Sequence, residues 1–345
     1  MKSVAAAVGV SLSTVSNAYN KPDQLSADVR ERIFAAAREL GYSGPHAAAR
    51  TLRSRRAGAI GLLLTEQLSY AFSDPFVVGL LAGLSEVAET TRTGLLLIPL
   101  ARYESGADEA AMHESVETMR NAVVDGVVAY CIDAGHPALE VISRRGLPFV
   151  HTEDHIAAGR RVLIDEVGAM RGLGEYLARL GHTEVAMVVD SGRATTAPHE
   201  ITDATTLYGN ARLRIQGLRE GLGANARLTV VSGGHDSVEA GIAAAALALD
   251  RRDRPTAIAT GGDVLAFGVI EAMRQRGLAP GRDISVTGFD DVPAAESVGL
   301  TTVRQPIRDK GRLLGRMLLD PSYTADRVLL PTELIIRSST GPVRS

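Results

Sequence analysis

Residues 8–20 read Val-Gly-Val-Ser-Leu-Ser-Thr-Val-Ser-Asn-Ala-Tyr-Asn, and this stretch decides how the first part of the chain folds. Gly9 has the permissive backbone that a tight turn requires. Ser11 is a typical N-cap, so we expect a helix over residues 12–19. Val15 and Ala18 share the inward face of that helix. Its other faces carry side chains that can point outward: Leu12, Ser13, Ser16 and Asn17.

Helical patterns flank this stretch on both sides. Residues 4–8 are small and apolar and suit a short first helix. Ser26 is a suitable N-cap for a third helix, which Gly41 ends. Apolar residues recur within it at helical spacing: Val29, Ile33, Ala36, Ala37 and Leu40. Three short helices bury little area, so residues 1–44 are expected to form a small all-α head.

Charge is distributed unevenly along the chain. The net charge of all 345 residues is only −3. Residues 1–58 nevertheless hold nine Lys or Arg and four Asp or Glu, which gives +5 and leaves −8 for residues 59–345. A basic head on an acidic body indicates that the head binds a polyanion.

The segment from Val8 to Asn20 resembles the helix-turn-helix of the lactose/galactose repressor family. The family's Gly-Val-Ser, Thr-Val-Ser and closing Asn recur here in order and at the family's spacing. Further matching residues follow: Val29-Arg30 and Glu39-Leu40-Gly41-Tyr42. The resemblance implies contacts to DNA phosphates from Ser11, Thr14, Ser16 and Asn20. It implies contacts to base edges in the major groove from Leu12, Ser13 and Asn17.

The chemistry of these side chains fits that division. Short hydroxyl side chains and a helix N-terminus hold phosphate oxygens without reading sequence. Asn17 offers a bidentate pair to adenine, and Leu12 offers an apolar contact to a thymine methyl group. The alternative is that Ser11, Thr14 and Ser16 merely cap and solvate a helix.

Residues 45–58 are expected to link the head to the body. The stretch from His46 to Arg56 contains good helix formers, four arginines and no acid. It resembles the family's hinge helix, which folds when two subunits pair over the minor groove. The resemblance implies minor-groove contacts from Ala49 and Leu52, while Arg50 and Arg53 can neutralise phosphates. A solvated linker is the alternative.

Residues 59–345 alternate short apolar runs with helical stretches, which is typical of an α/β fold with parallel sheets. Strands are expected at 59–65, 94–100, 126–131, 147–152, 161–164, 185–189, 228–232, 257–260 and 284–288. Helices are expected near 75–91, 107–121, 137–145, 168–180, 209–222, 237–249, 264–276 and 308–319. One open sheet of that size is uncommon, so two lobes are expected.

The body also resembles the repressor family and, through it, the type I periplasmic-binding-protein-like fold. Matching stretches include Asn210 to Gly217, Val286 to Asp291 and Leu300 to Pro306. The resemblance implies chain crossings near 155–162, 290–293 and 320–328. The first lobe would then hold about 59–158 and 292–322, and the second about 159–291 and 323–345. The body would bind an effector and form a homodimer on double-stranded operator DNA.

Ligands of open parallel sheets bind beyond the carboxyl ends of the strands. Asp290 and Glu153 follow two predicted strands, and the resemblance adds Arg214 and Gln305 as effector contacts. A guanidinium with carboxylates and an amide suits the vicinal hydroxyls of a sugar-like or nucleoside-like ligand. Gly262 stands where the lactose repressor has an Asn that holds sugar. The chain has no Trp, so aromatic contacts would come from a set that includes Phe72 and Phe76.

Other function classes receive less support from the sequence. No leader and no apolar run of about 18 residues is seen, so a cytoplasmic protein without membrane contact is expected. Cys131 is the one cysteine, and no metal site or cofactor is expected. His151, Glu153 and His155 alternate as metal ligands can, but no further ligand points there. No catalytic motif supports an enzyme. A ligand-dependent activator and a solute-binding protein of a transporter remain alternatives.

Overall fold

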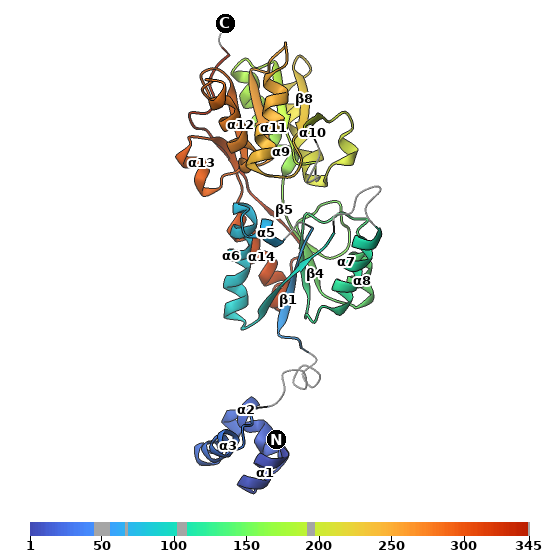
Figure 1. Cartoon of the computed structure of the whole chain (residues 1–345), viewed down its shortest axis with the longest axis vertical. Helices are drawn as coiled ribbons and strands as arrows, with labels where there is room; N and C mark the ends of the chain where they lie inside the picture. Colours follow the sequence, from blue (N-terminus) through green and yellow to red (C-terminus); the bar gives the residue numbers. More distant parts are fainter. Residues whose placement is uncertain (45–55, 66–67, 102–108, 192–196, 344–345) are drawn as a thin grey trace. The chain divides into compact units, whose positions relative to one another are not determined.

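The computed structural model describes residues 1–44, 56–65, 68–101, 109–191 and 197–343. These residues form two compact units, Met1–Gly58 and Ala59–Ser345. Figure 1 shows that the first unit is helical and that the second combines helices with sheets. Every helix in the described ranges is too short or too polar to span a bilayer.

The first unit is a three-helix head. It contains α1 (Lys2–Val8), α2 (Leu12–Asn20), a 3₁₀ turn (Pro22–Gln24) and α3 (Ala27–Glu39). Gly9 has a φ of 72°, which lets α1 end one turn before α2 begins. The side chains of Ser11 and Ser26 accept hydrogen bonds from backbone amides, as N-caps do. Val15 and Ala18 are buried with Ile33 in one apolar core. The three predicted helices are confirmed, as is the burial of Val15, Ala18, Ile33 and Ala37, whereas Leu40 is 50% exposed at the end of α3.

The second unit begins with a parallel sheet of strand order β12-β5-β4-β3-β1-β2. Its strands are β1 (Ala59–Leu64), β2 (Gly94–Pro99), β3 (Val127–Tyr130), β4 (Phe149–His151), β5 (Arg160–Ile164) and β12 (Arg327–Leu330). Helices α6 (Pro75–Thr90) and α14 (Ile307–Leu319) cover one face, and α7 (Glu109–Asn121) and α8 (Ala138–Arg144) cover the other (Figure 1). The short α5 (Leu68–Ala71) precedes α6. This sheet with its helices is the first lobe.

The second lobe is built around a sheet of order β13-β11-β10-β9-β6-β8-β7. Its strands are β6 (Glu184–Val188), β7 (His199–Glu200), β8 (Arg227–Ser232), β9 (Ala257–Thr260), β10 (Ser285–Asp290), β11 (Thr301–Arg304) and β13 (Glu333–Ile335). Its helices are α9 (Glu166–Arg179), α10 (Gly209–Leu222), α11 (Val238–Leu249), α12 (Asp263–Gln275), α13 (Pro293–Ser297) and a 3₁₀ turn (Ala204–Thr206). Only β7 and β13 pair antiparallel among the described strands.

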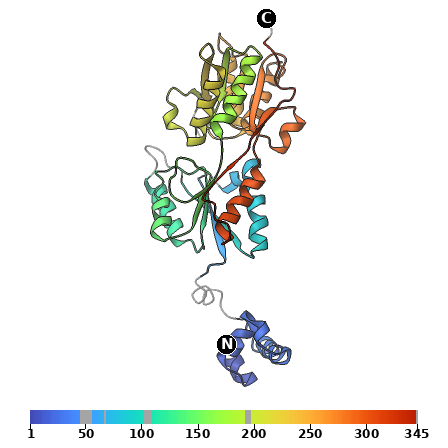
Figure 2. The same ribbon diagram turned by 180° about the vertical axis from the view of Figure 1, so that it is seen from behind.

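Strand pairing moves the lobe boundaries from the expected positions. β5 pairs in parallel with β4 and with β12, so β5 and β12 both belong to the first lobe. β11 pairs with β10 in the second lobe. The described chain therefore crosses between lobes just after Ile164, near Gln305, and between Leu330 and Glu333 (Figure 2). The expected crossings at 155–162, 290–293 and 320–328 were wrong, because the strand at 161–164 was placed in the second lobe and β11 and β12 were not recognised as strands.

Helices α6 and α14 pack so closely that glycines form the contact. A Cβ atom added to Gly83 would lie 1.9 Å from the carbonyl oxygen of Arg308. One added to Gly311 would lie 2.2 Å from the carbonyl oxygen of Leu80. Backbone atoms on both sides cannot give way as a flexible side chain can. The two glycines thus hold the late helix α14 against the early helix α6.

The substitution Gly83→Ala tests this contact. We expect a loss of about 1–3 kcal/mol in the free energy of unfolding, because the added methyl group overpacks the helix crossing. Gly172→Ala in α9 is the matched control, since a Cβ atom there meets nothing within 4 Å. The control should gain roughly 0.4–1 kcal/mol. Thermal and urea unfolding of both variants measures this, and a Gly83→Ala protein as stable as the control would contradict the close packing.

Candidate functional sites

The N-terminal end of α2 presents a group of hydroxyl side chains. Ser11, Leu12 and Ser13 are exposed, and Leu12 is 44% exposed although it is apolar. The Ser11 hydroxyl lies 2.6 Å from that of Ser13 and 2.8 Å from that of Thr14. Ser11 also accepts a hydrogen bond of 3.0 Å from the amide of Thr14. Exposed hydroxyls at the positive end of a helix form a surface suited to a phosphate.

Ser16 differs from the expected outward arrangement, whereas Asn20 is exposed. Ser16 is only 5% exposed, so the expectation that it points outward is wrong. The Asn20 side-chain amide donates to the Ser16 carbonyl at 2.9 Å and lies 3.3 Å from its hydroxyl. Both side chains therefore contribute to closing the end of α2. Asn17 is half-buried, and its amide lies 3.5 Å from the Gln24 side-chain oxygen. The expected hinge contacts Ala49, Arg50, Leu52 and Arg53 lie outside the described residues.

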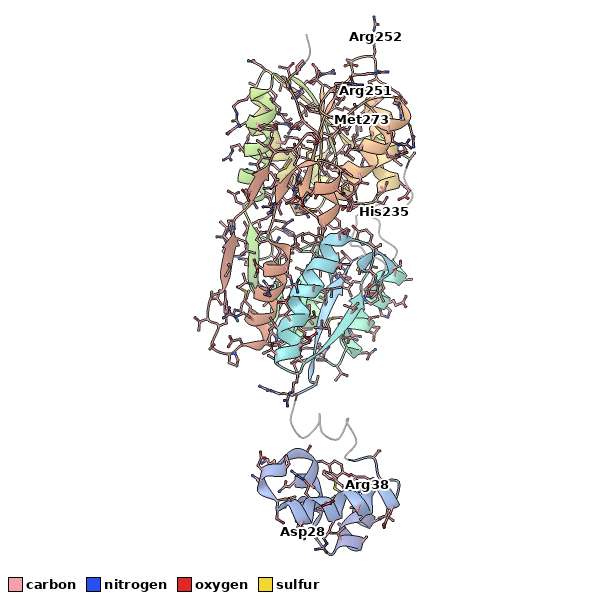
Figure 3. The ribbon with its side chains drawn as sticks, turned by 90° about the vertical axis from the view of Figure 1, so that its left-hand side faces the viewer. Asp28, Arg38, His235, Arg251, Arg252 and Met273 are labelled. Carbon is pink, nitrogen blue, oxygen red and sulfur yellow. The ribbon has the colours of Figure 1, made fainter. Side chains whose placement is uncertain are left out.

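The second unit contains a cavity between its two lobes. The first lobe contributes the loop and helix start after β1 and the ends of β3 and β4, and the second lobe contributes α10 and the ends of β6, β8, β9 and β10. Tyr70 and His235 face each other from opposite lobes with ring centroids 6.5 Å apart. Figure 3 shows His235 at the edge of the second lobe that faces the first. The carboxyl ends of parallel strands from both sheets thus meet at one place.

Arg214 is the central cation of this cavity. Its Nε donates to Glu166 at 2.7 Å, and a second nitrogen donates to the carbonyl oxygen of Gly261. The guanidinium lies 3.7 Å above the centre of the Phe289 ring, and the residue is 8% exposed. Burial would lower the pKa of Arg214, but the carboxylates of Glu166 and Asp290 raise it above its usual value. Arg214 is therefore a fixed positive charge with a defined orientation.

The Glu153 carboxyl group is held in place by hydrogen bonds from the ends of β3 and β4. Its Oε1 accepts hydrogen bonds of 2.9 Å from the amide of Cys131 and from the hydroxyl of Thr152. Cys131 has a φ of 52°, which is unusual for a residue with a side chain. Burial raises the pKa of Glu153, while the Thr152 hydrogen bond opposes that shift. The strained turn at Cys131 thus aims an amide at a buried carboxyl group of the cavity.

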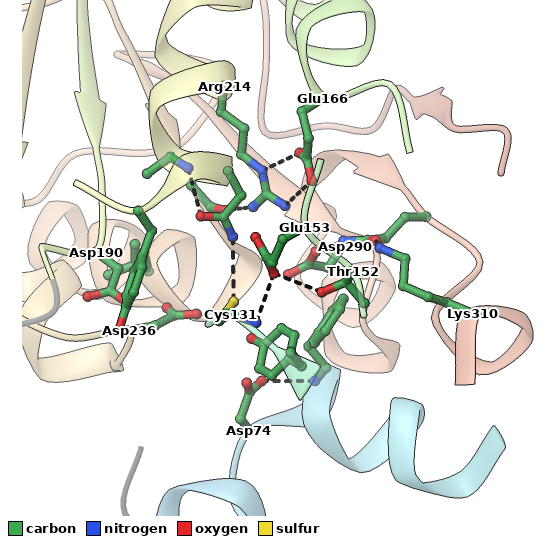
Figure 4. A pocket seen from close by; sticks show the side chains of 18 of the residues that line it. Asp74, Cys131, Thr152, Glu153, Glu166, Asp190, Arg214, Asp236, Asp290 and Lys310 are labelled. Atoms are coloured by element: carbon green, nitrogen blue, oxygen red, sulfur yellow. Dashed lines mark hydrogen bonds and ion pairs between the residues drawn. The ribbon is translucent and has the colours of Figure 1, made fainter. Parts of the chain in front are cut away.

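Three side chains connect the lobes through the crossing near Gln305. The Gln305 side-chain nitrogen donates to Asp290, and the Lys310 ammonium donates to the Gln305 oxygen at 2.6 Å. Asp290 ends β10 of the second lobe with a φ of 115°, whereas Lys310 lies on α14 of the first lobe. Burial raises the pKa of Asp290 and lowers the pKa of Lys310. A group bound in the cavity would therefore contact a hydrogen-bonded link between the lobes (Figure 4).

The cavity brings together most of the predicted effector residues. Phe76, Glu153, Arg214, Asp290 and Gln305 all line it. Gly262 borders it, since a Cβ atom there would lie 3.2 Å from Asp236 and 3.7 Å from Asp290. Phe72 is 67% exposed and is not part of the lining, so the structure does not bring it together with the other predicted effector residues. The loop that carries Phe72 turns its side chain to solvent instead.

Sequence reasoning missed several acidic and basic residues of the lining: Asp74, Glu166, Asp190, Asp236 and Lys310. Asp190 and Asp236 follow β6 and β8, so the rule that selected Asp290 and Glu153 would have found them. Asp74 is the N-cap of α6 and accepts a hydrogen bond of 2.9 Å from the amide of Phe76. No group of three or more His, Cys, Asp or Glu residues is arranged for a metal ion within the described ranges.

Two family models match the chain. The model of bacterial regulatory proteins of the lacI family matches residues 1–44, and that of a periplasmic binding protein-like domain matches residues 175–340. An HTH-type transcriptional regulator of Mycolicibacterium smegmatis is 39% identical over 99% of this chain and 96% of that protein. The ribose operon repressor of Escherichia coli K12 is 31% identical over 98% of this chain and 99% of its own length.

Solved structures agree with these matches. A lacI-family transcriptional regulator from Corynebacterium glutamicum is 32% identical, covers 98% of both chains and has a TM-score of 0.74. The Lac repressor dimer bound to operator and an anti-inducer is 25% identical over 98% of both chains, also with a TM-score of 0.74. The two-part architecture and the full-length matches lead to one conclusion. The chain belongs to the lacI family of bacterial transcriptional regulators.

Proposed function

We propose that this protein is a repressor that binds a near-palindromic operator as a homodimer. A sugar-like molecule bound between the lobes controls its affinity for that operator. The observation that carries the proposal is the presence in one chain of two sites. One is the hydroxyl-rich end of α2, and the other is a cavity lined by charged side chains from both lobes.

The DNA-binding half of the proposal is supported by α2. Exposed hydroxyls at its N-terminal end suit phosphates, and the neighbouring Leu12 and Asn17 have side chains that can contact base edges. The excess of Lys and Arg over Asp and Glu in residues 1–58 favours a polyanion. Twofold symmetry of the protein would require two similar half-sites in the operator.

The effector half is supported by the donors and acceptors of the cavity. Arg214, Asp290 and Glu153 are each less than one-tenth exposed and are held by hydrogen bonds before any ligand arrives. Such a preorganised set suits the hydroxyls of a sugar-like ligand. The relative in Escherichia coli is named for the ribose operon, which favours the same ligand class.

The two halves communicate if the ligand prefers one arrangement of the lobes. Asp290 and Lys310 come from opposite lobes and are joined through Gln305. A ligand that replaces or reinforces this link changes the relative free energy of open and closed lobes. Operator affinity changes only by the difference in ligand affinity between those two arrangements.

A homodimer is supported by an unpaired apolar edge in the first lobe. β2 is the edge strand of its sheet and contains Leu95, Leu96 and Leu97. Leu96 is 39% exposed, and Val78 on the neighbouring α6 is 45% exposed. A long apolar edge strand is a liability unless another surface covers it. We assign that cover to the same surface of a second copy of the chain.

The substitution Asn17→Ala tests the DNA site. We expect operator affinity to fall about 5-fold to 150-fold, because one base contact is lost. Affinity for random duplex should stay unchanged, since phosphate contacts remain. Fluorescence anisotropy with an operator selected from random sequence by the wild-type protein measures both. Equal losses on operator and random duplex would contradict base reading by Asn17.

The substitution Arg214→Ala tests the effector site. A thermal-shift screen of sugars, nucleosides and polyols first identifies a ligand that changes operator binding. The variant should bind that ligand roughly tenfold or more weakly, because a charged hydrogen-bond donor is lost, and should still bind the operator.

Arg171→Ala is the matched control for Arg214→Ala. Arg171 also pairs with a glutamate, Glu220 at 2.6 Å, but lies on the exposed surface of α9 and α10. The control should respond to the ligand as the wild type does. Normal ligand affinity of the Arg214→Ala protein would contradict the assignment of Arg214 to the effector site.

The substitution Leu96→Asp tests the dimer surface. A charge at the centre of an apolar contact should raise the dimer dissociation constant roughly tenfold or more, since the buried carboxylate lacks a partner. Analytical ultracentrifugation measures the constant. Val123→Asp is the control, because Val123 is 63% exposed but lies outside β2 and α6. Equal effects of both substitutions would argue against β2 as the dimer surface.

A further inference from the structure

We infer that the cavity selects its effector by charge, which rests on the proposed function. Asp74, Asp190 and Asp236 form an acidic wall that accepts hydrogen bonds from the hydroxyl or amino groups of an uncharged or cationic polyol. The same wall rejects phosphorylated and carboxylated sugars. Arg214, Glu153 and Asp290 bind the ligand's other hydroxyls.

The acidic wall is assembled from both lobes. Asp74 caps α6 in the first lobe, while Asp190 follows β6 and Asp236 follows β8 in the second. Figure 4 shows Asp190 and Asp236 beside each other, with Asp74 below them on the first lobe. All three line the cavity between the lobes. A ligand between the lobes is therefore in contact with carboxyl groups on both sides.

Asp236 has an acceptor that the described residues leave without a donor. Its Oδ1 is buried and has no hydrogen-bond partner within the described ranges. Its Oδ2 lies 3.2 Å from the point where a Cβ atom of Gly262 would stand, and an Asp290 oxygen lies 3.7 Å from the same point. Gly262 thus leaves room between two carboxyl groups. A buried acceptor without a donor is costly, and a ligand hydroxyl or amine would supply one.

Carboxyl groups outnumber basic side chains in the lining of the cavity. Its acidic members are Asp74, Glu153, Glu166, Asp190, Asp236 and Asp290, and its basic members are Arg214 and Lys310. Both basic side chains already donate to protein groups, Arg214 to Glu166 and Lys310 to Gln305. A phosphate or carboxylate would add a negative charge to this excess, and like charges in a poorly solvated site repel strongly.

The wall also links ligand charge to lobe movement. Asp74 opposes Asp190 and Asp236 across the cavity, so bringing the lobes together without a donor between them brings like charges together. A neutral or cationic polyol places donors between these carboxyl groups and removes that repulsion. An anionic ligand leaves it in place. Charge selection and stabilisation of the closed lobes therefore have the same cause.

Matched ligand sets test the inference on the full-length protein. Glucose, glucosamine, glucose 6-phosphate and glucuronate form one set, and ribose with ribose 5-phosphate forms another. The set is extended with the phosphate and acid counterparts of any neutral or amino polyol that binds in the screen. Titration calorimetry should show each anionic member at least about tenfold weaker than its neutral or amino counterpart. A tighter anionic member, or no binding by any neutral or amino member, would overturn the inference.

Operator binding measured on the same samples separates this inference from the proposed function. If an anionic sugar binds tightly and changes operator affinity, charge selection fails and ligand-controlled regulation stands. If a neutral polyol binds in preference to its anionic counterpart without changing operator affinity, charge selection stands and the proposed regulation fails.

The variant Asp236→Asn tests the wall directly and keeps the size of the side chain. The variant should bind the neutral or amino ligand more weakly. The ratio between the dissociation constants of the anionic and the neutral ligand should fall by about tenfold. Asp326→Asn is the control, because Asp326 is highly exposed and lies outside the cavity. An unchanged ratio between neutral and anionic ligands in Asp236→Asn would overturn the assignment of the wall.

A measurement without ligand gives an independent result. Burial raises the pKa of Asp236, and the charges of Asp74, Asp190 and Asp290 raise it further while Arg214 opposes them. The folded protein therefore binds this proton more tightly than the unfolded chain, so the wild type loses stability as pH rises above about 4. Asp236→Asn removes that loss. Its melting temperature should exceed the wild-type value by more at pH 8 than at pH 5, and a difference that does not grow with pH would contradict a destabilising carboxylate at Asp236.

Discussion

The direction of the strands is the constraint on which the ligand cavity depends. Parallel strands deliver the residues that follow them to one edge of a sheet, and the two sheets of the body have those edges opposite each other. Glu153 from one sheet and Asp290 from the other reach the same cavity for this reason alone. The helices on the two faces of each sheet bury apolar clusters and leave the edge free for polar side chains.

The charged residues of the cavity are tolerated because nearly all of them have partners. Arg214 is paired with Glu166 and stacked on Phe289, and Lys310 reaches Gln305 rather than a free carboxylate. A buried charge without a partner would be costly, so these contacts are part of what keeps the cavity folded. The Asp236 oxygen is different, because the described protein atoms do not satisfy it. Arg214 and Lys310 thus stabilise the folded cavity, whereas Asp236 needs a hydrogen-bond donor from a ligand.

Much of the fold could be predicted from local patterns, and the lobe boundaries could not. The apolar runs at 59–65 and 257–260 and the caps Ser11 and Ser26 are local signals, and the structure has strands and helices there. β12 is a short strand whose partner β5 lies far away in sequence, so pairing alone reveals its lobe. Glu153, Asp290 and Arg214 were found from strand ends and family resemblance. Ser16 was misplaced because packing in three dimensions, and not position on the helix, determines its exposure.

The route of the chain between the lobes has a consequence for biosynthesis. The first lobe needs α14 and β12, which end at Leu319 and Leu330, to cover one face of its sheet and to complete its edge. A nascent chain on the ribosome can fold its head as soon as residues 1–44 emerge, since that core is local. The lobe encoded next must wait, with part of its apolar sheet uncovered, until the chain has been translated as far as Leu330. Chaperones that shield apolar surface would therefore be needed most during synthesis of the middle of this protein.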